Sequence, residues 1–222
     1  MKKQTAVVIG ATGLIGTHLV QQLLSDDTFT IVRTLSRKQL VFNHQKLQQR
    51  IVNFNDLNDF TTKLGEGDII FSCIGTTQKN VKGNNEEYKK IDHDIPLHAA
   101  EAGVLQGFKK FLIVSSVGAD ATSSNFYLQL KGRIENEIKS LPFESVSIFR
   151  PSMLLGKRME KRRFEKVLQG SIKFISGFMI GALQKYHSIY AKDVAKAMIA
   201  ESKQENTGIH IFKYKEIMHL IR

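Results

Sequence analysis

The sequence predicts an α/β fold in which a doubly wound parallel sheet is covered by helices on both faces. Near the start, the apolar run 6–9 breaks into a glycine-containing turn, and helical periodicity begins at Leu14. Short apolar runs then alternate with helical segments along the chain, as in βα units that build a parallel sheet. The run 111–114 contains no polar residue, which is typical of a strand buried on both faces.

The composition is that of one globular protein. The chain has 222 residues, of which 42% are hydrophobic and 24% are charged, enough for one sizeable core. Cys73 is the single cysteine, so no internal disulfide framework exists. The Met-Lys-Lys start leads directly into the first strand without a cleavable signal, which predicts a cytoplasmic location. The longest apolar stretch, 174–183, is shorter than the roughly 20 residues of a membrane span, so we predict no transmembrane segment.

The net charge of +11 has a local component. The segment 157–166 holds six basic residues against two acidic ones. Such a segment is either a solvated helix face or a nucleic-acid site. We favour the solvated face because no aromatic residues alternate with the charges to stack on bases. Nucleic acid is therefore not a predicted partner, and no metal site is predicted.

The glycine turn indicates nucleotide binding. Gly10 permits a tight turn, Gly13 lets the backbone approach a pyrophosphate, and Gly16 lets the helix lie close to the strand. The free N–H groups and the helix dipole then face the phosphates. An ordinary strand-to-helix turn is the alternative, but the position after a strand and before a helix favours a Rossmann fold. The residues predicted to bind the cofactor here are Gly10, Ala11, Thr12, Gly13, Leu14, Ile15 and Gly16.

The end of the second predicted strand, 29–35, indicates which cofactor binds. A fold that binds NAD normally has an acidic residue here for the ribose hydroxyl, whereas a 2′-phosphate requires cations and a hydroxyl donor. The residues present are Ser36, Arg37 and Lys38. They favour NADP(H) over NAD(H), with a basic surface loop as the alternative.

The next two predicted strands, 50–54 and 68–72, place further residues at the same edge of the sheet. After the first of them, Asn55 and Asp56 are expected beside the adenine; Asp56 equally fits the N-cap of a helix over 57–64. Ligands of open α/β sheets collect at the carboxyl ends of strands. We interpret Cys73 as a packed small hydrophobe in preference to a nucleophile. The residues that follow the second strand and are predicted to contact the cofactor are Cys73, Ile74, Gly75 and Thr76.

A polar loop over 78–85 precedes a long predicted helix, 86–103. Pro96 lies inside this helix, so the helix either kinks or restarts there. The strand 111–114 then ends at Ser115 and Ser116, either of which is placed to bond a substrate oxygen. Ser115 is also predicted to contact the cofactor.

The acid–base residues follow in a predicted helix over 125–141. Tyr127 and Lys131 stand four apart, about one helical turn, so both side chains share a face. A lysine cation beside a phenol stabilises the phenolate, which makes Tyr127 a usable acid or base near neutral pH. The spacing alone is common by chance. The spacing indicates an acid–base pair here because the glycine turn and the serine pair precede it in this order.

The remaining elements complete one domain over 1–222, in which 151–222 contribute a small extension on the substrate side. A strand is predicted over 145–149, and Pro151 turns the chain outward. The segment 157–184 is expected to flank the substrate cleft, with its apolar residues forming core, a dimer face or a substrate wall. Asp193 is expected to cap a helix, and a strand over 208–212 and a helix over 215–221 close the chain.

The motifs at 10–16, 72–77, 115–120, 125–132 and 149–151 together resemble those of the atypical short-chain dehydrogenase/reductases. The chain is most similar to their Tat-interacting oxidoreductase-like branch, whose bacterial members are described as epimerases or NAD(P)H-binding proteins. The resemblance covers almost the whole chain.

The resemblance implies roles for particular residues. It implies that Tyr127 is the acid/base, that Lys131 binds the nicotinamide ribose, and that Pro151, Ser152 and Met153 lie near the carboxamide. Two features depart from the family pattern. Only eleven positions separate Ser116 from Tyr127, and Asp92 stands where many relatives have asparagine.

Three functions compete. The leading one is an NADP-dependent oxidoreductase that transfers hydride between nicotinamide and a small carbonyl or alcohol substrate, with Ser116, Tyr127 and Lys131 as its catalytic residues. The second is a non-catalytic NADPH-binding regulatory protein with a protein partner; a homodimer fits either. The third is a sugar-nucleotide epimerase or dehydratase, although the residues after Pro151 are few for its substrate domain.

Overall fold

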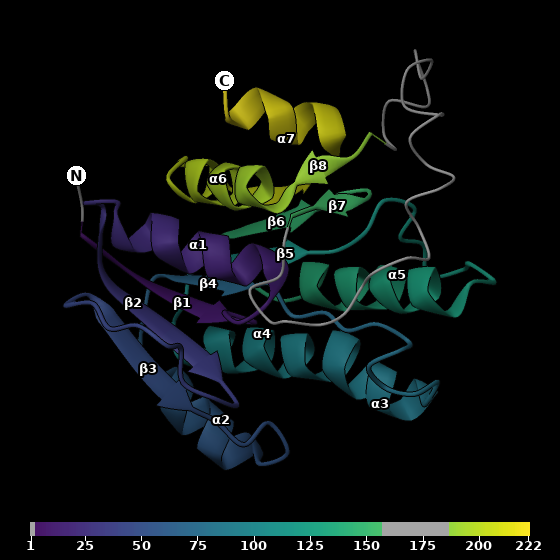
Figure 1. The fold of residues 1–222 in the computed structure, drawn as a ribbon, viewed down its shortest axis with the longest axis horizontal. Coiled ribbons are helices and arrows are strands. Elements are labelled where there is room, and N and C mark those ends of the chain that lie inside the picture. Colours follow the sequence, from purple (N-terminus) through teal and green to yellow (C-terminus); the bar gives the residue numbers. More distant parts are fainter. Residues whose placement is uncertain (1–2, 157–186) are drawn as a thin grey trace.

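The computed structural model describes residues 3–156 and 187–222. Its main sheet has seven strands in the order β3-β2-β1-β4-β5-β6-β9 (Figure 1), and every neighbouring pair is parallel. The predicted doubly wound parallel sheet is therefore confirmed. The strands are β1 (Gln4–Ile9), β2 (Phe29–Ser36), β3 (Leu47–Ile51), β4 (Ile69–Ser72), β5 (Lys110–Val114), β6 (Ser145–Phe149) and β9 (Gly208–Phe212).

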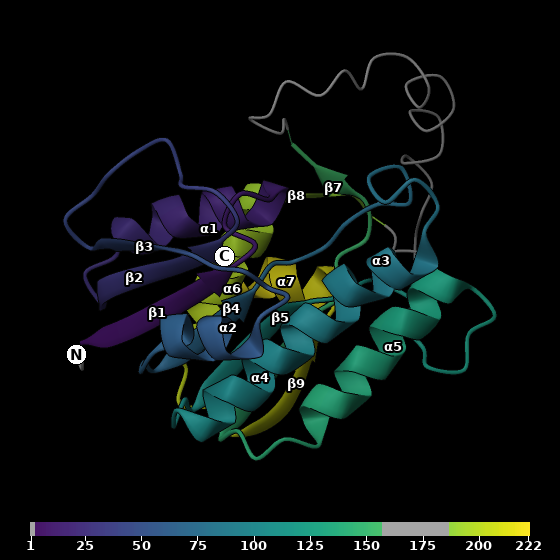
Figure 2. The same ribbon diagram turned by 90° about the horizontal axis from the view of Figure 1, so that it is seen from below.

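Helices cover both faces of this sheet (Figures 1 and 2). One face carries α1 (Leu14–Leu24), α6 (Ala191–Ser202) and α7 (Tyr214–Leu220). The other carries α2 (Leu57–Leu64), α4 (Ile95–Leu105) and α5 (Phe126–Lys139). Successive side chains of a strand point to opposite faces, so along β1 Ala6 and Val8 join one apolar core while Val7 and Ile9 join the other.

The long helix predicted over 86–103 forms three connected pieces. They are α3 (Asn85–Lys89), a π-helical turn η1 (Lys90–Asp94), and α4. Pro96 lies in the first turn of α4. Because proline has no N–H and its ring crowds the preceding turn, the helix widens into a π turn just before it. This turn positions Asp92, which becomes important at the candidate site.

Two predictions about local structure were wrong. The third strand covers Leu47–Ile51 instead of 50–54, because β3 lies at the sheet edge and pairs through polar Gln48 and Gln49 instead of an apolar run. Asp193 does not cap α6, whose N-cap is Tyr190. Asp193 lies in the first turn, where a carboxylate still favours the positive end of the helix dipole.

The C-terminal part of the chain contributes to two sheets. Within 151–222, α6, β9 and α7 complete the main layers, while β7 (Leu154–Leu155) and β8 (Ile189–Tyr190) form a separate parallel pair. The basic segment 157–166 and the apolar stretch 174–183 lie outside the described residues. Among the helices that the structure describes, none has the length and apolar character needed to cross a membrane.

Candidate functional site

The glycine turn lies where the strand order of the sheet reverses. β2 and β3 lie on one side of β1, and β4, β5 and β6 lie on the other. Crevices at such switch points hold ligands in open α/β sheets. The turn approaches its surroundings closely: Gly10 has φ +82°, and a Cβ on Gly16 would lie 2.1 Å from the Gly10 carbonyl oxygen. A larger residue at Gly16 would push the helix away from the turn, and a larger residue at Gly10 would collide with the Cys73 backbone after β4.

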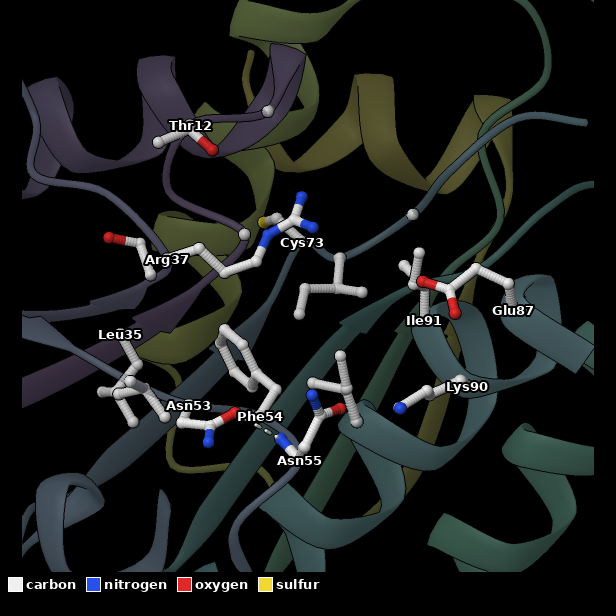
Figure 3. Close-up of a pocket in the computed structure, with 17 residues that line it drawn as sticks. Thr12, Leu35, Arg37, Asn53, Phe54, Asn55, Cys73, Glu87, Lys90 and Ile91 are labelled. Carbon is white, nitrogen blue, oxygen red and sulfur yellow. Dashed lines mark hydrogen bonds between the residues drawn. The ribbon is translucent and has the colours of Figure 1, made fainter. Parts of the chain in front are cut away.

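A cavity of about 320 Å³ opens beside this turn (Figure 3). Segments from the ends of β1, β2, β3 and β4 form its walls, together with α3 and η1. The structure thus brings together predicted residues that are far apart in the sequence. Those that line the cavity are Gly10, Thr12, Gly13, Ser36, Arg37, Asn55, Cys73, Ile74 and Gly75.

The basic residues after β2 occupy different positions. Figure 3 shows the Arg37 side chain extended across the cavity toward Cys73, with Asn55 and Lys90 on the opposite wall. The Ser36 hydroxyl lies 2.6 Å from the Lys38 carbonyl oxygen and donates to it, which fixes the bend of this loop. Lys38 itself is exposed and does not line the cavity.

Asp56 has a structural role that the sequence left open. Its carboxylate accepts from the Asn58 and Asp59 backbone N–H groups at 3.0 and 3.1 Å and caps α2. The neighbouring wall of the cavity consists of Asn53, Phe54 and Asn55. The contact between Asp56 and adenine stays a prediction.

Cys73 contributes its backbone and an apolar surface to the cavity wall. Burial raises the pKa of its thiol to about 12, so the thiol remains protonated at neutral pH. A thiol becomes a strong nucleophile only as the thiolate. This supports the interpretation of Cys73 as a small hydrophobe. The Gly10 Cα lies so near that a Cβ there would meet the Cys73 carbonyl oxygen at 2.6 Å.

Tyr127 and Lys131 lie on the first two turns of α5, which begins at the Asn125 cap. The Lys131 ammonium forms an ion pair with Asp92 from η1, with Nζ and Oδ1 3.0 Å apart, and both side chains are almost completely buried. Burial by itself lowers the pKa of Lys131, but Asp92 and Tyr127 outweigh burial and the pKa is raised. Lys131 is therefore a cation at neutral pH.

The two serines after β5 have different partners. The buried Ser115 hydroxyl donates to Glu135 at 2.5 Å, and the same carboxylate accepts from Arg150 Nε at 2.9 Å. The Ser116 hydroxyl donates to the carbonyl of Val117 at 3.3 Å. Ser115 thus belongs to a buried structural network, and Ser116 is the serine whose hydroxyl is held more weakly.

The remaining predicted residues do not line the cavity. Ala11 and Ile15 are buried in the core beside α1, and the Thr76 backbone N–H donates to Asp92 Oδ2 at 2.7 Å. The Ser152 hydroxyl donates to the His187 carbonyl, which connects the loop after β6 to the segment before β8. The described residues that are predicted to bind the cofactor but lie outside the cavity lining are Ala11, Leu14, Ile15, Gly16, Lys38, Asp56, Thr76, Ser115, Lys131, Pro151, Ser152 and Met153.

Among the residues near the site that sequence reasoning missed, three belong to α3 and η1. Glu87 and Lys90 line the cavity, although in the sequence they look like the polar face of an ordinary helix. Tyr88 is buried, and its hydroxyl donates to the Thr76 carbonyl at 3.3 Å. Burial raises its pKa, and Asp92 and Tyr127 raise it further. The one signal that was available is its spacing of four residues from Asp92 along the predicted helix.

Comparisons with known sequences identify relatives. The sequence model of a family described as NAD(P)H-binding matches residues 10–205. Protein HTATIP2 of Rattus norvegicus is 30% identical over 99% of this chain and 90% of its own length. The mitochondrial protein fmp52 of Emericella nidulans is 33% identical over 82% of this chain and 76% of its own length. The cytoplasmic location predicted from the sequence stays a prediction.

Solved structures share the fold. A UDP-N-acetylglucosamine 4-epimerase from Methanobrevibacter ruminantium M1 superposes with a TM-score of 0.71 at 21% identity, covering 96% of this chain and 77% of the epimerase chain. MoeE5, solved in complex with UDP-glucose and NAD, gives a TM-score of 0.71 at 17% identity over 97% of this chain and 80% of its own. With its Rossmann fold, its glycine-lined cavity and these relatives, the chain belongs to the NAD(P)H-binding family, as its resemblance to the atypical short-chain dehydrogenase/reductases predicted.

Proposed function

We propose that this protein is an NADP(H)-dependent oxidoreductase that interconverts a carbonyl and an alcohol, with Tyr127 as the acid/base. The observation that carries the proposal is a continuous line of contacts from the cavity to the acid–base pair. Gly75 lines the cavity, its neighbour Thr76 is bonded to Asp92, and Asp92 holds Lys131 on the helix face shared with Tyr127. A dinucleotide with its adenosine half in the cavity would have Gly75 on the cavity side and Lys131 toward its nicotinamide half.

The residues present fit the cofactor. Gly13, which has no side chain, lets a pyrophosphate approach the N-terminus of α1, where no side chain caps the first N–H groups of the helix. Asn55 and Phe54 offer a polar and an aromatic contact for adenine on the opposite wall. When bound, NADPH would supply the hydride for carbonyl reduction, and NADP+ would accept it in alcohol oxidation.

The chain supplies the proton and the positive charge. The Tyr127 hydroxyl donates its proton to the carbonyl oxygen as hydride arrives at the carbon, and takes the proton back in alcohol oxidation. The Lys131 cation stabilises the phenolate that remains. Ser116 is assigned the hydrogen bond to the substrate oxygen, because the Ser115 hydroxyl is already bonded to Glu135.

The preference for NADP(H) rests on Arg37, whose guanidinium extends into the cavity at the end of β2. We expect calorimetric titration to give tighter binding of NADPH than of NADH. In Arg37→Ala, the loss of charge-assisted hydrogen bonds worth about 1.5–3 kcal/mol should weaken NADPH binding by roughly 10- to 100-fold. Binding of NADH should change much less, since it has no 2′-phosphate.

Arg133→Ala is the matched control for this titration. Arg133 is exposed on α5 and does not line the cavity, so its loss changes net charge equally without touching the cofactor. An equal loss of NADPH and NADH affinity in Arg37→Ala would contradict the 2′-phosphate role. Failure of the unmodified protein to bind either nucleotide would contradict the proposed function itself.

One observation favours a second candidate, an NADPH-binding regulatory protein without turnover. Both serine hydroxyls after β5 have intramolecular partners, so neither is presented to a substrate without a change of hydrogen bond. The two candidates differ in one measurement. An oxidoreductase consumes NADPH with some members of a panel of aldehydes and ketones, whereas a regulatory protein binds NADPH equally well and consumes none.

A further inference from the structure

Asp92 is buried at the junction of three elements. It lies in the π turn η1 that precedes Pro96, and only 1% of its surface is exposed. A π turn inserts one residue into the helical repeat and is frequent at functional sites. Here the turn directs the Asp92 side chain between the loop that follows β4 and the second turn of α5.

The two carboxylate oxygens of Asp92 have different partners. Oδ2 accepts from the backbone N–H of Thr76 at 2.7 Å, and Oδ1 lies 3.0 Å from the Lys131 ammonium. The Oδ1 atom is also 3.6 Å from where a Cβ on Gly75 would lie. One carboxylate therefore connects the cofactor-side loop to the acid–base helix.

A buried ion pair gives little net stability, because removing both charges from water costs about as much as their attraction returns. The pair is thus not explained by folding alone. Its specific effect is on Lys131, since burial disfavours a lysine cation. The titratable groups that face this lysine are Asp92 from η1 and Tyr127 and Glu135 from α5, with Tyr88 of α3 beside Asp92 and Tyr127.

We propose that Asp92 is a positioning residue that keeps Lys131 charged and holds it in place against Tyr127, while binding the cofactor-side loop through Thr76. The catalytic meaning of this role rests on the proposed function. An asparagine at this position accepts from Thr76 equally well, but it presents either a neutral oxygen or an N–H donor to the ammonium. Only the carboxylate serves both partners and compensates the buried charge.

The test is a pH titration of Lys131 in the full-length, cofactor-free protein, followed by NMR of [ε-13C]lysine and assigned with Lys131→Met. In the unmodified protein Lys131 should remain charged up to and beyond 10.5, the ordinary lysine pKa. In Asp92→Asn the midpoint of the Lys131 titration should fall by about one pH unit or more, because burial lowers the pKa of Lys131 and the Asp92 carboxylate that raises it is gone. The control is Asp94→Asn, which removes a carboxylate of the same turn that pairs with His93 and Lys89; it should leave the Lys131 midpoint unchanged.

A double variant keeps the test decisive if Asp92→Asn folds poorly. Asp92→Asn/Lys131→Met removes both charges, so its thermal midpoint should exceed that of Asp92→Asn alone. An unchanged Lys131 titration midpoint in Asp92→Asn would overturn the proposal. If Asp92→Asn folds poorly, a double variant with no higher thermal midpoint than Asp92→Asn would also overturn it.

The catalytic consequence has its own readout. With a carbonyl substrate from the NADPH-consumption panel, kcat of Asp92→Asn should fall by about ten-fold or more, because positioned acid–base groups contribute about 10²–10⁴-fold. Its pH profile should also shift, whereas the profile of Asp94→Asn should not. A kcat loss without a shifted profile overturns the positioning role. If no substrate is turned over, the proposed function fails while the Lys131 titration still decides the role of Asp92.

Discussion

Tyr127 is held in place by its ring as well as by its helix. The ring meets Tyr88 edge-on, with centroids 6.1 Å apart and planes inclined at 74°, an arrangement that aromatic pairs prefer. Tyr88 in turn bonds Thr76, the residue bound by Asp92. The phenol and the lysine of the site thus share one set of supports on α3 and η1.

The Tyr127→Phe substitution tests the acid/base role directly. It keeps the ring and its edge-on contact with Tyr88 and removes only the hydroxyl. We expect turnover of a carbonyl substrate to fall by roughly 10²- to 10⁴-fold, with NADPH affinity within about two-fold of the original by calorimetry. Tyr190→Phe, at an exposed tyrosine of β8, should leave both unchanged. Turnover at the original rate in Tyr127→Phe would remove Tyr127 from the mechanism.

At the scale of single residues, the sequence predicted which residues lie near the cavity better than it predicted the hydrogen-bond and ion-pair partners of each side chain. The glycines, Arg37 and Cys73 were identified because their spacing follows a local rule about turns and strand ends. The partners of Asp92 and Glu135 were not predictable. Each carboxylate meets side chains or backbone from other elements, and no local pattern encodes such a contact.

Among the elements, α5 is fixed to the sheet by Glu135. This carboxylate is fully buried and binds Ser115 at the end of β5 and Arg150 at the end of β6. It lies one turn beyond Lys131 on α5. The network therefore sets how far α5 reaches along the carboxyl ends of the strands, and with it the position of Tyr127.

Glu135→Gln should destabilise the fold more than other changes on this helix. It leaves the Arg150 guanidinium without its compensating charge, and breaking one side of a buried pair costs about 3–5 kcal/mol. The midpoint of urea unfolding measures this loss. Glu137→Gln is the control on the same helix; its half-exposed carboxylate bonds His93, and its loss should cost about 1 kcal/mol or less. Equal midpoints in the two variants would contradict the role of Glu135.

At the same scale, the predicted elements were confirmed where apolar periodicity is strong, as for α1, β5 and β6. The third strand was displaced because an edge strand needs no apolar run. For the proline in the long helix, the sequence allowed either a kink or a restart at Pro96. The structure has a π turn just before Pro96, and α4 begins at Ile95. Which of the possible responses to a proline occurs depends on packing against α5, and that packing lies outside the helix's own sequence.

For the whole molecule, the doubly wound parallel sheet was predictable from the alternation of strands and helices, because parallel strands require crossover connections of this kind. The residues that line the cavity could be predicted from the sequence only in part. Its opposite wall includes Glu87 and Lys90, which lie in the predicted helix over 86–103 but were not predicted to contact the cofactor. Residues from four strand ends, α3 and η1 meet there, and only the tertiary fold brings them together.

An ion pair on one face of the sheet connects the turn after α1 to the end of α6, which are far apart in the sequence. Asp26, in the turn between α1 and β2, bonds Lys203 just after α6. Burial raises the pKa of Asp26, but hydrogen bonds from Lys203 and the Thr28 backbone outweigh it and the pKa is lowered. The contribution to stability is therefore complete above the ordinary carboxyl value of 3.8 and is lost as the pH falls below it.

Asp26→Asn should lower the free energy of unfolding at pH 7 by about 1 kcal/mol or less and weaken the loss of stability below pH 4. The measurement is the thermal midpoint between pH 7 and pH 3. Asp27→Asn removes the neighbouring, fully exposed carboxylate and should leave the pH dependence as it is. If the thermal midpoint of Asp26→Asn fell more steeply with decreasing pH than that of the original protein, the stabilising role of the Asp26 carboxylate would be contradicted.

The helix that begins at the glycine turn is covered by residues from the other end of the chain. Ile15 and Leu19 of α1 share an apolar core with Val194 and Met198 of α6 and with Ile217 of α7. During synthesis on the ribosome, the nucleotide-binding turn therefore emerges first, but its supporting face is complete only after the last two helices have been made. A nascent chain that stops before α6 should be unable to retain the cofactor, even though every residue lining the cavity has already been translated.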